Sequence, residues 1–441
     1  MLVIKEGDSG SYVDSVQLAL ERAGFSPGKI DGVFGGRTKA SVIRFQQSRG
    51  LTPDGIVGRM TANQLRPYLA GYTTYTVRPG DTLDQIARNL HSTVPLIENA
   101  NPDIEASDLR VGDRLNVPFD FPLVPTNVSY HSMLCELICE GLSVRYPFIT
   151  LSVAGRSVQN RPIPMLKMGR GAKKVFFNAA HHANEWITTP LVLKFVEDYA
   201  TGVTNATQLG GQNSEYMFDS ATLYIIPMVN PDGVDLVTGA IQKDSEAYMD
   251  VLAMANNYPS IPFPSGWKAN IKGVDLNLNY PAMWERAKEL KYAAGFTKPG
   301  PRDFVGAFPL SEPESRAIFE ISGAIGFDIT VSFHTQGEEI YWKFENYIPK
   351  GGRELGERMA RASGYRLAET ARFSSYAGYK DWFIMIYLLP GYTVEAGRGQ
   401  NPLPIALFGS IYPHVLAIMA EALAFEEPTN PPLHTPPENA T

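Results

Sequence analysis

The stretch that decides the fold of the largest part of the chain is Val175-Phe176-Phe177-Asn178-Ala179-Ala180-His181-His182-Ala183-Asn184-Glu185-Trp186. Its first half is apolar and of strand length, which predicts a buried strand that turns into a helix near Glu185. His182 and Glu185 stand in a His-x-x-Glu pattern at this turn, so both side chains can reach one ion. Phe333-His334-Thr335 follows another apolar run and offers His334 as a third ligand. Two His and one Glu form the ligand set of an open, hydrolytic zinc site.

Strand-sized apolar runs and helical stretches alternate around this turn, from residue 124 to residue 426. The runs are 149–153, 174–179, 222–229, 329–334 and 391–395, and the helical stretches include 190–199, 312–323, 352–362 and 405–424. This alternation predicts a large α/β domain with a mixed central sheet flanked by helices. Residues 427–441 form a Pro-rich tail that we expect to be extended.

The first small part of the chain, residues 1–70, contains a half-repeat built on Asp-Gly turns. Asp31-Gly32-Val33-Phe34-Gly35 is echoed by Asp54-Gly55-Ile56-Val57-Gly58, and a helix precedes each copy. Glycine allows the positive φ that such turns need, so the pattern predicts a small all-α domain with helices at 12–23, 38–48 and 61–69. The segment resembles the three-helix peptidoglycan-binding domain of bacterial and phage cell-wall hydrolases. A helical scaffold that binds no ligand is the alternative.

Residues 74–119 form a second small part with a strand-helix-helix-strand pattern. Its first strand ends in the turn Pro79-Gly80-Asp81, and either Asp81 or Thr82 can cap the helix that follows. The pattern resembles a LysM module, a small α+β fold (βααβ), and this resemblance implies binding to the N-acetylglucosamine face of glycans. Asp84 departs from the resemblance, because many LysM sequences carry an aromatic residue there.

The composition limits the classes of function. The 441 residues carry 39 Lys and Arg against 46 Asp and Glu, a net charge of −7, which argues against a nucleic-acid partner. With 44% hydrophobic residues the chain can build a large core, so a wholly disordered protein is excluded. No apolar run reaches the roughly 18 residues of a membrane span. The first residues lack the basic and apolar stretches of a signal peptide. We therefore expect no signal peptide, no membrane span and a monomer.

Residues 124–426 resemble the zinc carboxypeptidase (carboxypeptidase A-like) family. Besides the two zinc-ligand motifs, the resemblance rests on Asn230-Pro231-Asp232-Gly233, Gly273-Val274-Asp275-Leu276-Asn277 and Tyr392-Thr393-Val394-Glu395-Ala396-Gly397. It implies one Zn²⁺ per chain, held by His182, Glu185 and His334, with Glu395 as the catalytic glutamate. It also implies that Asp275 orients a zinc-bound His and that Asn277 contacts the substrate.

The chemistry of such a site assigns roles to two further groups. Zn²⁺ lowers the pKa of a water toward about 7 and polarises a carbonyl. Glu395 is expected to take the proton of the water and pass it to the leaving nitrogen. The oxyanion that forms needs a positive partner, and the position that the family fills with Arg is occupied here by Lys272.

Several departures from the family concern substrate binding. Exopeptidases of the family clamp a terminal carboxylate with Asn-Arg, whereas this chain reads Asn277-Leu278-Asn279, so a C-terminal requirement should fail. The tyrosine that closes over the substrate aligns with Phe373 or, with a shift, with Tyr376. Lys380 aligns with the position that sets side-chain preference and favours an acidic group, unless it is a solvated surface lysine. Arg398 can serve the same acidic substrate.

The resemblance is closest to γ-D-glutamyl-L-diamino acid endopeptidases. It implies hydrolysis of the γ-D-glutamyl bond to meso-diaminopimelate or Lys in peptidoglycan and muropeptides, and a place at the cell wall or spore cortex. We expect no signal peptide, yet the substrate lies in the wall or cortex. Retention in the sporangium until lysis would reconcile these two expectations. The alternatives are a carboxypeptidase that removes C-terminal residues, a zinc deacylase, and a wall or spore-coat binding protein without activity. The complete set of His182, Glu185, His334 and Glu395 argues against the last.

Overall fold

The computed structural model of the protein describes residues 3–104, 109–370 and 376–426. The chain divides into two compact units. The first unit comprises Met1–Leu151 with Thr238–Ala240, and the second comprises Ser152–Val237 with Ile241–Thr441. The predicted tail 427–441 and the predicted Phe373 lie outside the described residues.

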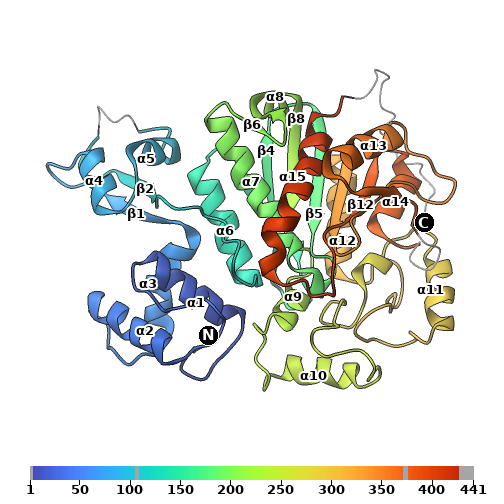
Figure 1. Ribbon diagram of the computed structural model, residues 1–441, viewed down its shortest axis with the longest axis horizontal. Coiled ribbons are helices and arrows are strands. Elements are labelled where there is room, and N and C mark those ends of the chain that lie inside the picture. The colour runs from blue at the N-terminus through green and yellow to red at the C-terminus, as the bar shows by residue number, and fades with distance from the viewer. Residues whose placement is uncertain (1–2, 105–108, 371–375, 427–441) are drawn as a thin grey trace. The chain divides into compact units, whose positions relative to one another are not determined.

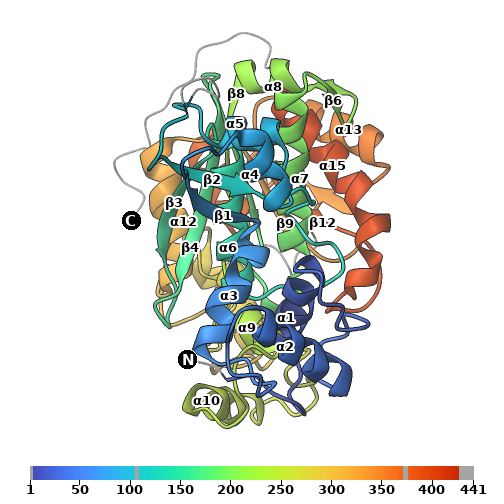
Figure 2. The ribbon, with the colours of Figure 1, turned by 90° about the vertical axis from the view of Figure 1, so that its left-hand side faces the viewer.

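Three helices build the first module of unit 1, as the sequence predicts. They are α1 (Ser11–Arg22), α2 (Gly36–Ser48) and α3 (Arg59–Ala70), shown in blue in Figure 2. Their apolar faces meet in a core that contains Val16, Leu20, Phe45 and Leu65.

The two Asp-Gly turns of this module are held in the same way. Gln17 of α1 accepts hydrogen bonds from the backbone of Asp31 and Gly32 at its Oε1 atom, both at 3.0 Å, and its Nε2 atom donates to Asp31 and Thr38. Gln46 of α2 repeats this pattern with Asp54, Gly55 and Thr61. Gly32 and Gly55 adopt φ of 67° and 75°, the left-handed region that glycine occupies without strain. The sequence half-repeat is therefore a structural repeat.

The second module of unit 1 has the predicted strand-helix-helix-strand order. Its elements are β1 (Tyr72–Thr76), α4 (Leu83–Asn89), α5 (Val94–Ala100) and β2 (Arg114–Pro118), and the two strands pair antiparallel. Thr82 caps α4, since its hydroxyl accepts from the backbone of Gln85 at 3.3 Å. Asp81, the other predicted cap, instead accepts from the backbone of Arg78.

Helix α6 (Ser132–Arg145) also belongs to unit 1, although residues 124–426 were predicted as one domain. Glu140 of α6 accepts hydrogen bonds from Arg66 and from Tyr72, one on each side of the junction between the modules. Gly141 lies so close to α3 that a Cβ there would stand 1.9 Å from the carbonyl oxygen of Ala70. The first helix of the predicted domain therefore packs on the wall-binding modules.

The stretch 119–125, which follows β2, is held by two arginines. Arg22 of α1 donates to the carbonyl oxygens of Pro122 and Leu123 at 2.9 and 2.8 Å. Arg145 of α6 donates to those of Phe119 and Phe121 at 2.7 and 3.0 Å. Carbonyl groups that a loose linker would expose to water are thus bonded inside unit 1.

A mixed sheet forms the centre of unit 2 (Figure 1). Among the described residues it has eight strands, in the order β11-β10-β12-β9-β5-β8-β4-β3. The strands β12, β9, β5 and β8 are mutually parallel, whereas β4 and β10 run antiparallel to β8 and β12. The bounds are β3 (Thr150–Arg156), β4 (Pro162–Gly169), β5 (Lys173–Ala179), β8 (Ala221–Ile226), β9 (Ile329–His334), β10 (Glu339–Tyr341), β11 (Arg366–Ala368) and β12 (Gly391–Glu395).

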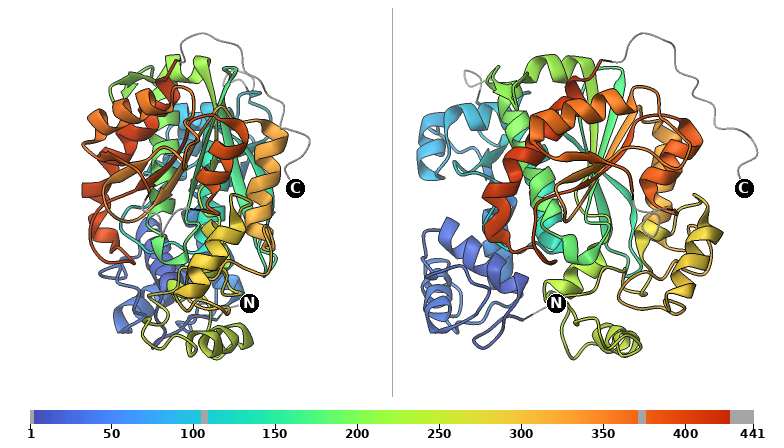
Figure 3. Two further views of the ribbon diagram at one scale, coloured as in Figure 1. Left: turned by 90° about the vertical axis from the view of Figure 1, so that its right-hand side faces the viewer. Right: turned by 45° about the vertical axis from the view of Figure 1, so that its right-hand side comes forward.

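Helices cover both faces of this sheet. Successive residues of the central strand β5 point to opposite faces, so each face presents apolar side chains to a helix. Phe176 of β5 stacks on Phe327 and faces Tyr379 of α14, while Phe177 packs against Phe195 of α7. Figure 3 shows α13 and α15 on one side of the sheet and α12 on the other. The helices are α7 (Thr188–Thr204), α8 (Ser214–Ser220), α9 (Pro231–Val237), α10 (Glu246–Ala255), α11 (Trp284–Ala293), α12 (Pro313–Ile325), α13 (Gly352–Ser363), α14 (Tyr379–Tyr387) and α15 (Phe408–Ala424). A short pair, β6 (Gln208–Leu209) and β7 (Gln212–Asn213), lies apart from the sheet.

One helical stretch of the described chain, Ile405–Ala424, is long and apolar enough to cross a membrane by length and composition, with a mean hydropathy of 1.5. Its main part, α15, packs against α7, α8 and α13. Val415, Ile418 and Leu423 are fully buried. These buried side chains lie in the core of unit 2, and 39% of the apolar window is buried.

Candidate metal centre and catalytic site

The carboxyl ends of two parallel strands bring the three predicted metal ligands together. Strand β5 pairs with β9 so that Ala179 lies beside Phe333, and the chain leaves both strands at the same edge of the sheet. His334 is the last residue of β9, and His182 and Glu185 lie just beyond β5, in and before a short 3₁₀ turn (Ala183–Glu185). This turn, rather than the predicted start of α7, carries Glu185 to the site.

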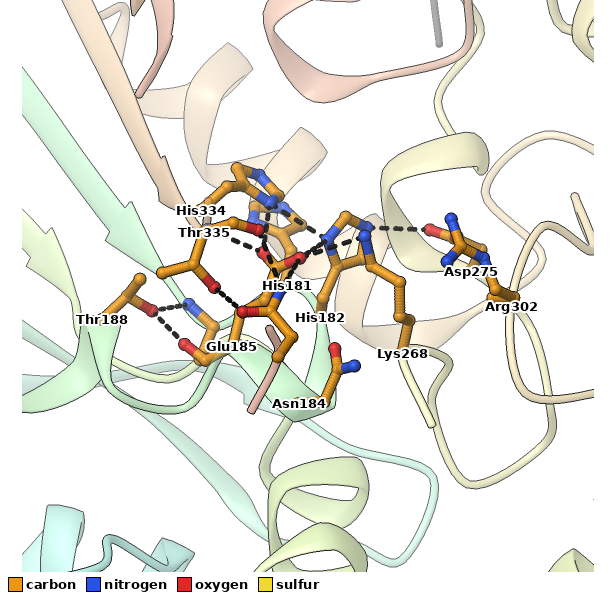
Figure 4. A network of polar contacts seen from close by, with 12 residues as sticks. His181, His182, Asn184, Glu185, Thr188, Lys268, Asp275, Arg302, His334 and Thr335 are labelled. Atoms are coloured by element: carbon orange, nitrogen blue, oxygen red, sulfur yellow. Dashed lines mark hydrogen bonds and ion pairs between the residues drawn. The ribbon is translucent and has the colours of Figure 1, made fainter. Parts of the chain in front are cut away.

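The three side chains point toward one another in Figure 4. The Nδ1 atoms of His182 and His334 are 3.1 Å apart, and they lie 3.1 and 3.0 Å from the two carboxylate oxygens of Glu185. Their ligand atoms all lie within 4.8 Å of one another, and all three residues are buried. The structure thus assembles the predicted trio.

The donor set fits a Zn²⁺ ion. His182 uses its Nε2 atom to donate to Asp275 at 3.0 Å, so its Nδ1 atom presents a lone pair to the other two ligands. Burial lowers the pKa of His182, but the Glu185 and Asp275 carboxylates outweigh it and raise that pKa to about 9. Positive charge is therefore favoured at this point, and a metal ion competes with the proton for it.

Glu395, the predicted catalytic residue, ends β12 and lies beside His334 in the parallel register of β12 and β9. Burial and the negative charge of Glu185 raise the pKa of Glu395 to about 8. A carboxyl group whose pKa lies near neutrality is suited to both accepting and delivering a proton.

Sequence reasoning missed a lysine at this centre. Lys268 places its ammonium 3.0 Å from an oxygen of Glu185, with 18% of its side chain exposed. The predicted Lys272 is exposed instead, in a loop where the side-chain oxygen of Asn270 accepts from the backbone of Lys272 and Val274. Both lysines precede Asp275 in one irregular loop, and no spacing rule distinguishes them.

Asn401 is a second residue that the sequence did not reveal. Its side-chain amide donates to the carbonyl oxygen of Thr335 at 2.9 Å and approaches Glu185 at 3.4 Å. Its Oδ1 atom accepts from the Thr335 hydroxyl at 2.7 Å. Asn401 therefore ties the loop after β12 to the end of β9, which a lone Asn before Pro does not signal.

A model of the zinc carboxypeptidase family matches residues 136–389, more than half of the chain. The chain belongs to the zinc carboxypeptidase family. Models of a peptidoglycan-binding domain and of a LysM domain match residues 9–65 and 75–118, which confirms the resemblances of both small modules. This zinc carboxypeptidase is thus a metallopeptidase joined to peptidoglycan-binding modules, a zinc peptidoglycan peptidase.

Individual relatives cover different parts of the chain. Gamma-D-glutamyl-L-diamino acid endopeptidase 1 of Lysinibacillus sphaericus is 41% identical over 297 residues, which span 67% of this chain and 72% of that protein. The spore cortex-lytic enzyme of Bacillus cereus is 37% identical over 83 residues, 19% of this chain and 32% of that enzyme. The crystal structure of carboxypeptidase A from Helicoverpa armigera superposes with a TM-score of 0.51 at 17% identity, covering 86% of this chain and 85% of that one, and shares the fold.

In this zinc carboxypeptidase the position of the family's carboxylate clamp is apolar and buried. Leu278 is 6% exposed and belongs to the core beside α12 and α14. The preceding Asn277 uses its side-chain oxygen to accept from the backbone of Tyr379 at 3.0 Å. Asn277 thus positions the start of α14, while Leu278 offers nothing to a carboxylate.

Lys380 is not the solvated lysine that we considered as an alternative. It is 5% exposed, and its ammonium donates to Asp381 at 2.5 Å and to the carbonyl oxygen of Lys343 at 2.9 Å. Close by lies a cavity of about 350 Å³. The residues that line it are Lys343, Phe344, Glu345, Asn346, Glu369, Thr370 and Tyr376.

The last two predicted substrate contacts lie in different surroundings. Tyr376 is 5% exposed and sets its ring at right angles to Phe344. Arg398 is 75% exposed and pairs with Glu338 at 2.6 Å, three residues after Glu395. Tyr376 is therefore part of a cavity wall, whereas Arg398 is available at the surface.

Proposed function

We propose that this protein hydrolyses the amide bond between the γ-carboxyl group of D-glutamate and an L-diamino acid in peptidoglycan stem peptides. The observation that carries the proposal is Leu278, buried where an exopeptidase needs an arginine. Without that clamp the active site has no requirement for a free C-terminus, so it accepts bonds inside a stem peptide. The relative that is 41% identical carries this activity in its name.

The residues of the site divide the work. His182, Glu185 and His334 would hold a Zn²⁺ ion, which would supply the positive charge that polarises the scissile carbonyl and acidifies a water. Glu395 takes a proton from the attacking water and returns it to the leaving nitrogen. Lys268 supplies a fixed positive charge for the oxyanion, the role that the sequence assigned to Lys272.

We assign substrate recognition to the exposed polar groups near the centre. Arg398 can meet a stem-peptide carboxylate, because its side chain is 75% exposed and that of its ion-pair partner Glu338 is 31% exposed. Lys380 forms an ion pair with the buried Asp381, so we assign it to the framework of α14 rather than to substrate binding. Tyr376 lines the cavity, and Asn277 positions the start of α14.

The wall-binding modules determine where the enzyme works. We propose that LysM binds N-acetylglucosamine-containing glycan and that the three-helix module binds peptidoglycan, so that muropeptides and stem peptides reach the centre. A spore cortex-lytic enzyme is 37% identical over 83 residues, which supports a cortex substrate and action after sporangium lysis.

Digestion of defined muropeptides followed by mass spectrometry tests the proposal, with Glu395→Gln as the control. Release of L-Ala-D-Glu and a fragment that begins with the diamino acid, lost in the variant, is the expected result. Loss of the terminal D-Ala alone would make the protein a carboxypeptidase. No cleavage by a zinc-loaded protein would favour the deacylase, and no cleavage by a protein that binds no zinc would favour a wall-binding protein.

A further inference from the structure

One short segment outside the catalytic motifs touches two groups of the metal centre. The carbonyl oxygen of Pro301 accepts from the backbone of Lys268 at 2.7 Å and from that of Ala269 at 3.0 Å. Asp303 donates its backbone N–H to Oδ2 of Asp275 at 3.2 Å, and the backbone of Asp275 donates to Phe304 at 2.9 Å. The segment 301–305 therefore holds both the lysine and the carboxylate behind His182 (Figure 4 shows Lys268, Asp275 and Arg302).

The Asp303 side chain fixes this segment by two ion pairs. Its Oδ1 atom lies 2.6 Å from the ammonium of Lys291, and its Oδ2 atom lies 2.6 Å from Nε of Arg302. Asp303 adopts a φ of 63°, a left-handed conformation that costs energy in every residue except glycine and is most tolerable in Asn and Asp. This conformation turns its N–H toward Asp275, and the ion pairs keep it there.

Helix α11 clamps the segment at two points. Lys291 is 4% exposed and reaches Asp303, which is 5% exposed. Trp284, the first residue of the same helix, donates its indole N–H to the carbonyl oxygen of Val305 at 3.1 Å. Because α11 is a rigid element, the position of the whole segment is tied to one helix.

A buried ion pair is a costly way to stabilise a fold, since apolar residues of the same volume serve as well or better. Its advantage is a fixed geometry. Here the ion pair fixes the segment 301–305, which contacts Asp275 behind His182 and, through Pro301, the backbone of Lys268.

We propose that Lys291 and Asp303 are positioning residues of the metal centre, which orient the ligand His182 and the cation Lys268 through the segment 301–305. The proposal rests on the proposed function only in its catalytic part. Zinc binding reports on it without any substrate.

The test is the double variant Lys291→Met/Asp303→Asn, in which no buried charge is left unpaired and Asn still tolerates the positive φ. We expect the zinc dissociation constant, measured by chelator competition, to rise about threefold to tenfold. On a muropeptide, kcat should fall while KM stays unchanged. The matched control is Arg353→Met/Glu357→Gln, which removes an exposed ion pair from α13 and should change neither quantity.

An unchanged zinc affinity in the folded double variant would overturn the proposal. Should that variant not fold, Lys291→Met/Asp303→Gly gives the same decision, because glycine adopts this φ freely and no ammonium is left buried without a partner. If the wild-type protein binds zinc yet cleaves no muropeptide, the proposed function fails while the zinc titration still decides the role of Lys291 and Asp303.

Discussion

The three-helix module and the metal centre are both built from a few polar side chains, but they are assembled in different ways. In the module, each glutamine reaches an Asp-Gly turn and a threonine close to it in sequence, and the same set occurs twice. In the metal centre, groups from residue 182 to residue 401 converge on Glu185. A short-range arrangement leaves a repeated trace in the sequence, whereas a long-range one is defined only by the fold.

The sharpest way to separate the two regions is to remove the general base. Glu395→Gln should lower kcat on a muropeptide by about a thousandfold, because Glu395 is the group assigned to take the proton of the attacking water. The melting temperature and binding to insoluble peptidoglycan should not change. Retention of a large part of the activity would show that Glu395 is not the base.

The two lysines of the loop before Asp275 test whether the structure or the sequence alignment identified the cation. Lys268→Met should lower kcat by about a hundredfold, the effect of losing one group that stabilises an oxyanion. Lys272→Met is the matched control and should leave kcat unchanged, since its side chain is exposed. The opposite pattern would identify Lys272 as the cation that stabilises the oxyanion.

The repeat of the three-helix module can be broken at either copy. Gln17→Ala and Gln46→Ala should each destabilise the module by about 2–3 kcal/mol, since each leaves several turn groups without a partner. Hydrogen exchange of peptides from α1 and α2 measures this, and kcat on a small muropeptide should be unaffected. Strongly unequal losses would show that the two copies are not equivalent in energy.

Acid should weaken unit 1 through His131, the buried cap of α6 that also contacts Ser15 at 2.8 Å. Burial lowers the pKa of His131 to about 3, below the 6.5 of the unfolded chain, so stability is complete above pH 6.5 and is lost as the pH falls toward 3. Between pH 6.5 and 5 the loss should be about 2 kcal/mol.

Hydrogen exchange of α1 and α6 at the two pH values, corrected for the intrinsic rate, measures this loss. His131→Asn keeps a capping side chain but does not titrate, so the variant should lack the pH dependence. Equal acid sensitivity of both proteins would assign the effect to another group.

The comparison also explains what the sequence could reveal. Strands 329–334 and 391–395 were predicted to the residue, because each is a short run rich in β-branched and aromatic residues that ends in a polar residue at the site. The edge strand β11 and its neighbour β10 have three residues each, too few to show a pattern.

The same contrast between residues with a local sequence pattern and residues without one appears in the site. The metal trio was predicted from motifs at strand ends, and the structure brings its members together. Lys268, Asn401 and the ion pair of Lys291 with Asp303 were not, because each lies in a loop or on a helix whose local sequence carries no signature. Only the fold reveals that Lys272 is exposed and that Lys380 is buried.

Gly71 has a mechanical consequence for the wall-binding unit. It ends α3 in a left-handed conformation, and β1 begins at the very next residue, so no slack chain separates the two modules. A tether of many residues would let each module search for its ligand alone. Here a single glycine joins the two modules, so when one of them is bound to the wall the other is held within reach of it.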